Sequence, residues 1–195
     1  KSSTINAPRC SKLVLLLFLI LAVMQTATAQ TLEGKITYTV DSARKITFDG
    51  VKKQIPVSLF SSYLIDPDYK SSMDYIKYEL SPTDRDIEVF KKGKFKIGYA
   101  VTYNNNKDIT YYFTKFKGLL IAIDIYESTK NQKTKYPRKC YRYDTNGQLI
   151  AAGIRVTEEE SFLYDKKQKL ITHRIGDYGY NDKGKRMWKA EEIEF

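Results

Sequence analysis

Hydrophobic and polar residues alternate along much of the chain, which is typical of β-strands with one buried face. The clearest run is Phe95–Tyr103, where aromatic and β-branched residues occupy every odd position. Shorter runs of the same kind span 36–40, 109–113 and 150–156. These residue types fit a pleated, half-buried surface. The nearly continuous apolar run Leu119–Tyr126 predicts a central strand covered on both faces.

Turn signals separate these runs at short intervals. Lys92-Gly93, Lys117-Gly118 and Asn146-Gly147 each fall between two strand-like segments. Connections this short join antiparallel neighbours, because a parallel neighbour needs a long crossover. The sequence therefore predicts a mainly β fold with a single antiparallel sheet of about eight to ten strands. The pattern leaves open whether that sheet is a meander, a sandwich or a barrel.

One segment has helical spacing. Met73, Ile76 and Leu80 lie three and four residues apart, after Asp66-Pro67-Asp68 and before Ser81-Pro82. An acidic start and a proline stop are typical of a short helix. We expect one or two short helices between residues 55 and 80, packed on one face of the sheet, and β structure from about Asp86 onward.

The N-terminus has the three parts of a secretory signal peptide. Basic residues precede the apolar run Leu13–Met24, and Ala27 and Ala29 form an A-x-A cleavage site. Those basic residues are Lys1, Arg9 and Lys12. The run is shorter than the roughly 20 residues that a transmembrane helix needs. We expect residues 1–29 to be removed near Ala29, and residues 30–195 to be a single β-rich domain, secreted or periplasmic, without a transmembrane segment.

Composition narrows the class of protein. Sixteen tyrosines and nine phenylalanines exclude a disordered polar chain. Two cysteines exclude a disulfide scaffold and a four-cysteine zinc site, and one histidine excludes multi-histidine metal sites. After loss of residues 1–29 only Cys140 remains, and we expect it to be a small buried side chain. The sequence contains no phosphate-binding, dinucleotide-binding or zinc-protease motif, so we expect no cofactor and no metal.

Three segments near the C-terminus are alike. Each has an aromatic strand end, a polar turn and a basic or amide residue before the next strand. The segments are Tyr143–Leu149, Tyr164–Leu170 and Tyr180–Lys185, and the step from Gly184 to Trp188 follows the last of them. Residues 141–190 thereby resemble the Tyr-Asp and MORN-like repeats of bacterial surface and toxin-associated proteins. The resemblance implies an array of β-hairpins and no particular chemistry.

Two residues are candidates for catalysis. Asp124 interrupts the most apolar run of the chain, and a buried carboxylate must be paired or shift its pKa. His173 is the single histidine and shares a strand face with Ile171 and Ile175. A structural role fits both residues better than a catalytic one. A small secreted hydrolase with a carboxylate site around Asp124 and His173 is the alternative function.

The function that the sequence favours is an exported, non-enzymatic binding or structural module. A hairpin with four lysines borders tyrosine-rich strands, and this combination suits anionic partners. The predicted binding residues are Lys91, Lys92, Lys94, Lys96, Tyr99, Tyr103, Tyr178 and Tyr180. The expected partners are an anionic glycan, the cell-envelope surface or another protein, and we expect no nucleic acid.

Overall fold

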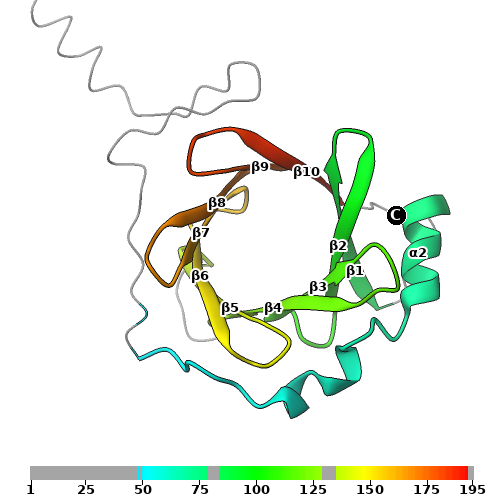
Figure 1. The fold of residues 1–195 in the computed structure, drawn as a ribbon, viewed down its shortest axis with the longest axis horizontal. Coiled ribbons are helices and arrows are strands. Elements are labelled where there is room, and N and C mark those ends of the chain that lie inside the picture. The colour runs from blue at the N-terminus through cyan, green and yellow to red at the C-terminus, as the bar shows by residue number, and fades with distance from the viewer. Residues whose placement is uncertain (1–47, 49, 79–83, 129–134, 193–195) are drawn as a thin grey trace, which may run out of the picture. The chain divides into compact units, whose positions relative to one another are not determined.

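The computed structural model describes residues 48, 50–78, 84–128 and 135–192. Within them the chain forms two 3₁₀ helices, one α-helix and ten β-strands (Figure 1). The helical elements are η2 (Val57–Leu59), η3 (Ser61–Tyr63) and α2 (Tyr69–Tyr78). The strands are β1 (Arg85–Lys92), β2 (Phe95–Tyr103), β3 (Ile109–Thr114), β4 (Leu120–Tyr126), β5 (Arg138–Tyr143), β6 (Leu149–Arg155), β7 (Glu160–Asp165), β8 (Leu170–Ile175), β9 (Tyr178–Tyr180) and β10 (Arg186–Glu192). The prediction of a mainly β fold is confirmed.

The sheet closes into a barrel. Each strand pairs antiparallel with its neighbour in sequence, and β1 also pairs with β10. This closing pair runs from Glu88 opposite Glu192 to Lys91 opposite Lys189. Closure pairs the strands that would otherwise form the two edges of the sheet. The alternation pattern leaves open a meander, a sandwich or a barrel, and the structure is a barrel.

Most predicted elements lie where the pattern places them. The predicted strand Phe95–Tyr103 has the bounds of β2, and the apolar run from Leu119 becomes β4. The helical spacing at Met73 and Ile76 falls within α2, Tyr69–Tyr78, whereas Leu80 lies outside the described residues. The stretch before it forms the 3₁₀ helices η2 and η3. The predicted strand at 36–40 and the signal segment lie outside the described residues.

Each even-numbered strand carries a β-bulge just after its hairpin turn. On β2, for example, Phe90 pairs with Gly98 and Lys91 pairs with Lys96, so Ile97 is an extra residue. The extra residues of the five bulges in the described strands are Ile97, Ile121, Ile150, Ile171 and Met187. A bulge bends its strand and increases the local twist. Repeating it in every hairpin curves the sheet toward closure.

Three of the hairpin turns are built in the same way. In each, a side-chain Oδ1 atom accepts hydrogen bonds of 2.8–3.0 Å from the backbone N–H groups two and four residues later. The accepting residues are Asp144, Asp165 and Asn181. The third residue after each has a positive φ; these residues are Gly147, Gln168 and Gly184. The sequence similarity of the three segments therefore encodes a shared turn, in which an Asp or Asn side chain caps backbone donors.

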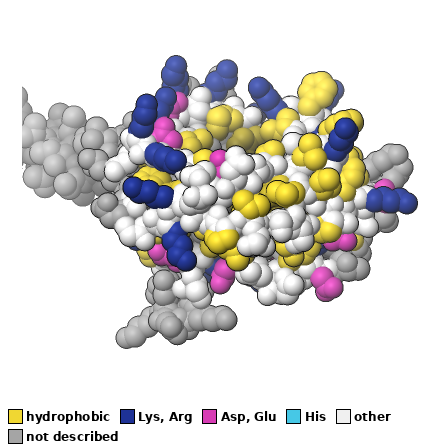
Figure 2. All heavy atoms as spheres, turned by 60° about the horizontal axis from the view of Figure 1, so that its bottom comes forward, with side chains coloured by type: hydrophobic (Ala, Val, Ile, Leu, Met, Phe, Trp, Pro, Cys, Tyr) yellow, Lys and Arg dark blue, Asp and Glu magenta, His cyan; other side chains and the backbone are white. Residues whose placement is uncertain are grey.

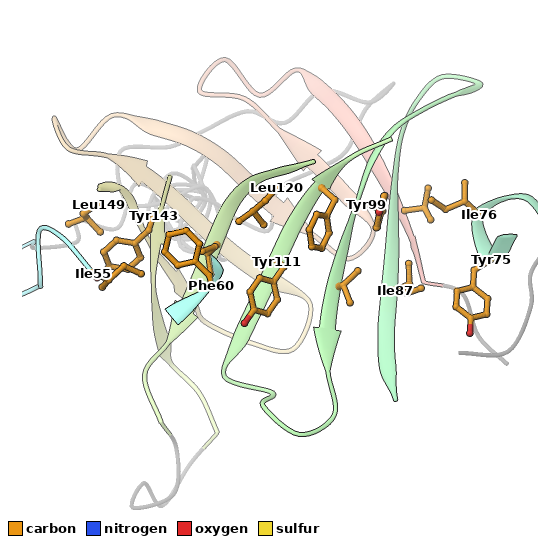
Figure 3. Packing of buried hydrophobic residues seen from close by; sticks show 14 residues of the cluster. Ile55, Phe60, Tyr75, Ile76, Ile87, Tyr99, Tyr111, Leu120, Tyr143 and Leu149 are labelled. Atoms are coloured by element: carbon orange, nitrogen blue, oxygen red, sulfur yellow. The ribbon is translucent and has the colours of Figure 1, made fainter. Parts of the chain in front are cut away.

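The main hydrophobic core lies between the barrel wall and the segment that precedes it. Ile55 lies beside Tyr143 and Leu149, and Phe60 lies between Tyr143 and Tyr111 (Figure 3). Ile76 of α2 belongs to the same cluster, on the side of Ile87. In Figure 1 the elements η2, η3 and α2 lie outside the ring of strands. The core thus uses the outward side chains of the strands, and the alternate side chains point into the barrel.

A buried carboxylate ties this segment to the barrel. Asp66 is 2% exposed, and its Oδ2 accepts hydrogen bonds from Tyr99 Oη (2.8 Å) and Ser72 Oγ (2.6 Å). The backbone N–H of Asp66 donates to the carbonyl of Gly118 in the β3–β4 turn (2.8 Å). Because each partner comes from a different element, the loop before α2 is held in one position on the wall.

Candidate functional site

The inside of the barrel contains a cavity of about 280 Å³. Every strand except β9 contributes to its lining. The lining extends from Ile97 and Ile121, next to the hairpin turns, to Glu158–Glu160, at the opposite end of the strands. Its charged and aromatic residues include Glu88, Phe90, Tyr112, Asp124, Tyr126, Arg142, Arg155, Arg174 and Trp188. A cavity with a few convergent polar groups is the usual form of a small-molecule site.

Asp124, Arg142 and Tyr112 form one hydrogen-bonded cluster in the cavity wall. Arg142 binds the Asp124 carboxylate with two nitrogens, Nε to Oδ1 at 2.6 Å and Nη2 to Oδ2 at 2.7 Å. Tyr112 Oη donates to Oδ2 at 2.9 Å, and the Arg142 guanidinium lies 4.3 Å from the centre of the Tyr112 ring. Such a two-pronged contact fixes both side chains and neutralises the buried carboxylate.

Burial and the Asp124 charge determine how this cluster ionises. Burial, and then the Asp124 carboxylate, raise the pKa of Tyr112 well above its ordinary value. Burial alone would lower the pKa of Arg142, but Asp124 and Tyr112 raise it well above its ordinary value. The cluster therefore keeps a protonated tyrosine and a charged arginine at neutral pH.

A second ion pair crosses the barrel interior. Arg174 on β8 binds Glu88 on β1 with two nitrogens, at 2.6 and 3.1 Å, and its Nε donates to the carbonyl of Gly176 at 2.8 Å. Strands β9 and β10 separate β8 from β1 in the barrel. The pair therefore braces the wall on both sides of the closing β1–β10 contact.

An aromatic group forms the apolar part of the cavity. The Phe90 ring lies 5.2 Å from the Trp188 ring, edge to face, and 6.1 Å from the Tyr112 ring, stacked. Trp188 covers Gly179, where an added Cβ atom would lie 2.1 Å from Cε2 of the indole. A glycine at this position allows the tryptophan to lie flat against β9.

Cys140 is buried and free, as expected for a small packed side chain. Burial raises the pKa of its thiol well above the ordinary value. The thiol therefore stays protonated at neutral pH and is a poor nucleophile.

The structure places the two catalytic candidates on opposite faces of the barrel wall. Asp124 lines the cavity with both oxygens bound, as described above. On β8 the neighbours Thr172 and Arg174 line the cavity, so His173 between them points outward. Its ring stacks on Phe162 with centroids 4.1 Å apart, and its Nε2 hydrogen bonds to Glu160 Oε1 at 2.8 Å. Asp124 and His173 are therefore not brought together.

The burial of His173 is expected to make the stability of the fold sensitive to acid. Burial lowers its pKa below the ordinary 6.5, although the bond to Glu160 opposes this. As the pH falls through about 6.5, the unfolded chain takes up a proton that the folded chain resists, so this group's contribution to stability is lost on acidification. We expect the urea midpoint to fall between pH 7.5 and about pH 5 by less in His173→Gln than in the wild type. Equal falls in the two proteins would contradict this assignment.

The predicted binding tyrosines do not form one exposed face. Tyr99 and Tyr180 are 0% and 2% exposed, and Tyr103 and Tyr178 are half-buried. The Tyr99 hydroxyl is used by Asp66, and the Arg186 guanidinium lies 5.3 Å from the centre of the Tyr178 ring. Of the four predicted lysines, Lys92 and Lys94 are exposed in the β1–β2 turn, whereas Lys91 and Lys96 are half-buried. Lys91 pairs with Glu191 on β10.

Sequence reasoning missed several residues of the cavity lining, namely Glu88, Phe90, Arg142, Arg174 and Trp188. A signal for two of them is present on β1, where Ile87 and Val89 occupy one face and Glu88 and Phe90 the other. A strand with large side chains on both faces is covered on both faces, which a barrel with a filled interior requires.

In the described part of the chain, no three His, Cys, Asp or Glu side chains gather as metal ligands would. Among the described residues, no helix has the length and apolar character needed to cross a membrane.

Comparisons of the chain with protein-family models, with curated proteins and with solved structures find no match.

Proposed function

We propose that this is an exported, non-enzymatic binding protein whose barrel interior takes up a small organic molecule. The observation that carries the proposal is the 280 Å³ cavity, lined by aromatic rings and by two ion pairs. Closed barrels of this size have room inside for side chains or for one small ligand. An outer hollow of about 440 Å³ between the 3₁₀ segment and β2–β4 has no charged residue in its described lining, which favours the interior as the more specific site.

The two buried ion pairs of the cavity disfavour a multiply charged ligand. Asp124 is neutralised by Arg142, and Glu88 is neutralised by Arg174. A multiply charged ligand would have to break one of these pairs and leave a buried charge without its partner. A molecule with an apolar ring or short chain and a few hydrogen-bonding groups would instead stack on Phe90 or Trp188. Its polar groups would hydrogen bond to the ion-paired side chains without separating them.

The arrangement favours binding over hydrolysis. Both oxygens of Asp124 accept hydrogen bonds from Arg142 and Tyr112, which stabilise the carboxylate and weaken it as a base or nucleophile. His173 lies on the other face of the wall, where it cannot act with Asp124.

The proposed location outside the cytoplasm rests on the sequence pattern of residues 1–29. The mass of the protein isolated from its producing cell tests whether these residues are removed.

Ligand entry is measurable because Trp188 is the single tryptophan of the chain and lines the cavity. We expect the naphthalene sulfonate dye ANS to quench Trp188 emission in a saturable titration. We expect Thr172→Phe, which fills the cavity, to weaken this binding about tenfold or more. Lys166→Phe adds the same ring to an exposed turn and should leave the titration unchanged. Equal affinity in the wild type and in Thr172→Phe would overturn an interior site.

A further inference from the structure

The five turns that follow the odd-numbered strands lie at one end of the barrel, because consecutive antiparallel strands return to the same end after every second strand. We call this end the turn end; it comprises the turns β1–β2, β3–β4, β5–β6, β7–β8 and β9–β10. In the described residues it carries nine exposed lysines: Lys92 and Lys94 on the first turn, Lys115 and Lys117 on the second, Lys183 and Lys185 on the fifth, and three on the fourth. Figure 2 shows Lys and Arg side chains gathered along the upper edge, with hydrophobic side chains among them.

Few acidic side chains oppose these lysines. Asp144 and Asp165 are turned inward to cap backbone N–H groups. Asp182 lies 3.3 Å from Lys169 and offsets that one charge. The turn end is therefore strongly positive, and its charges face solvent together.

Two phenylalanines project from the same end. Phe95 is 77% exposed and Phe116 is 74% exposed. They belong to adjacent hairpins, since β2 pairs with β3. The neighbouring bulge residues Ile97 and Ile121 are also exposed, at 49% and 53%. An exposed apolar patch surrounded by charge marks an interaction surface, because it gives the folded chain no stability in water.

The β3–β4 turn, which carries Phe116, is held in place by hydrogen bonds. Thr114 Oγ1 donates to the Phe116 carbonyl at 2.6 Å, and the Lys117 N–H donates to Tyr69 Oη at 3.0 Å. The Lys117 Nζ lies 5.6 Å from the centre of the Phe116 ring. The aromatic side chain and its neighbouring cation are thus presented together on a fixed turn.

We propose that the turn end docks on the surface of a lipid bilayer that contains anionic lipids. Lysines near such a surface each strengthen binding about fivefold, and aromatic rings insert at the level of the headgroups. A soluble polyanion would use the lysines but would leave Phe95 and Phe116 in water. A bilayer engages both, since it offers negative charge and an apolar layer behind it. This surface borders the interior cavity, because Ile97 and Ile121 also contribute to the cavity lining, but its docking on a bilayer does not require a ligand in the cavity.

The test is sedimentation of the protein with vesicles of phosphatidylcholine, with and without phosphatidylglycerol, at low and high salt. We expect binding only to the anionic vesicles, and we expect high salt to weaken it. Lys94→Gln/Lys117→Gln should weaken binding about thirtyfold. Lys107→Gln/Lys139→Gln removes the same charge from exposed sites outside the turn end and should have little effect.

The phenylalanines separate a bilayer from other partners. We expect Phe95→Ser/Phe116→Ser to weaken vesicle binding about tenfold while leaving the urea midpoint unchanged. If this variant binds vesicles as the wild type does, or if both proteins bind soluble dextran sulfate as tightly as vesicles, the partner is a polyanion and the proposal is wrong. Equal binding to neutral and anionic vesicles would also overturn it.

Discussion

Replacing Asp124 with alanine is expected to lower the free energy of unfolding by about 3–5 kcal/mol. The Arg142 guanidinium would then lose both of its carboxylate hydrogen bonds while remaining largely buried. An uncompensated charge in the barrel interior is costly, because water cannot replace the missing carboxylate. Urea unfolding followed by circular dichroism measures the loss.

The matched control is Glu158→Ala. Glu158 also pairs with a basic side chain, Lys135, but the two side chains are 74% and 65% exposed, so we expect a loss of only about 0–1 kcal/mol. The double variant Asp124→Leu/Arg142→Met removes both charges and should recover much of the stability lost in Asp124→Ala. A similar loss in Asp124→Ala and Glu158→Ala would show that the interior pair is not the sensitive one.

Gly147→Ala is expected to cost about 3 kcal/mol or more. Gly147 has a φ of 76°, and a Cβ atom there would lie 2.1 Å from the Ile55 carbonyl oxygen. The atom that the added Cβ would meet belongs to the Ile55 backbone. This backbone is itself bound to the turn, since the Ile55 N–H donates to the Gly147 carbonyl at 2.9 Å. The substitution therefore strains the turn and pushes the segment around Ile55 off the barrel.

Gly93→Ala isolates the backbone part of this effect. Gly93 has a similar φ of 60°, but nothing lies within 4 Å of the added atom. We expect this variant to lose about 1–2 kcal/mol, the cost of a left-handed alanine alone. Differential scanning calorimetry of the two variants gives the comparison, and equal losses would mean that Ile55 moves away without cost.

The sequence predicts the local structure of this protein well, and its long-range pairings poorly. Alternation defines β2 to the residue, because half-buried strands need one apolar face and nothing else. The bulge at Ile97 leaves no such signature, since an apolar residue at a bulge resembles one more strand position. The same pattern cannot show that β1 pairs with β10, because that contact depends on the accumulated curvature of the whole sheet.

The candidate site shows the same division. Asp124 is notable in the sequence because a carboxylate interrupts an apolar run, and the structure confirms that it is buried. Its partner Arg142 is set by the β4–β5 register, in which the two residues lie directly opposite each other. Asp124 and His173 both lie in strands. Whether each side chain points into the barrel or out of it depends on how the sheet closes, which the alternation pattern does not show.

The seam between β1 and β10 has a consequence for how the chain assembles. Every other strand pairing joins sequence neighbours, whereas Lys91 and Glu191 at the seam are 100 residues apart. Local hairpins form quickly and distant contacts form slowly, so the seam is the contact expected to close last. Lys91–Glu191 braces it directly, and Arg174–Glu88 braces it from inside the barrel. A chain whose seam stays open presents two free strand edges, and another open copy could pair with them. The seam charges that complete the barrel are thus also its protection against exchange of strands between molecules.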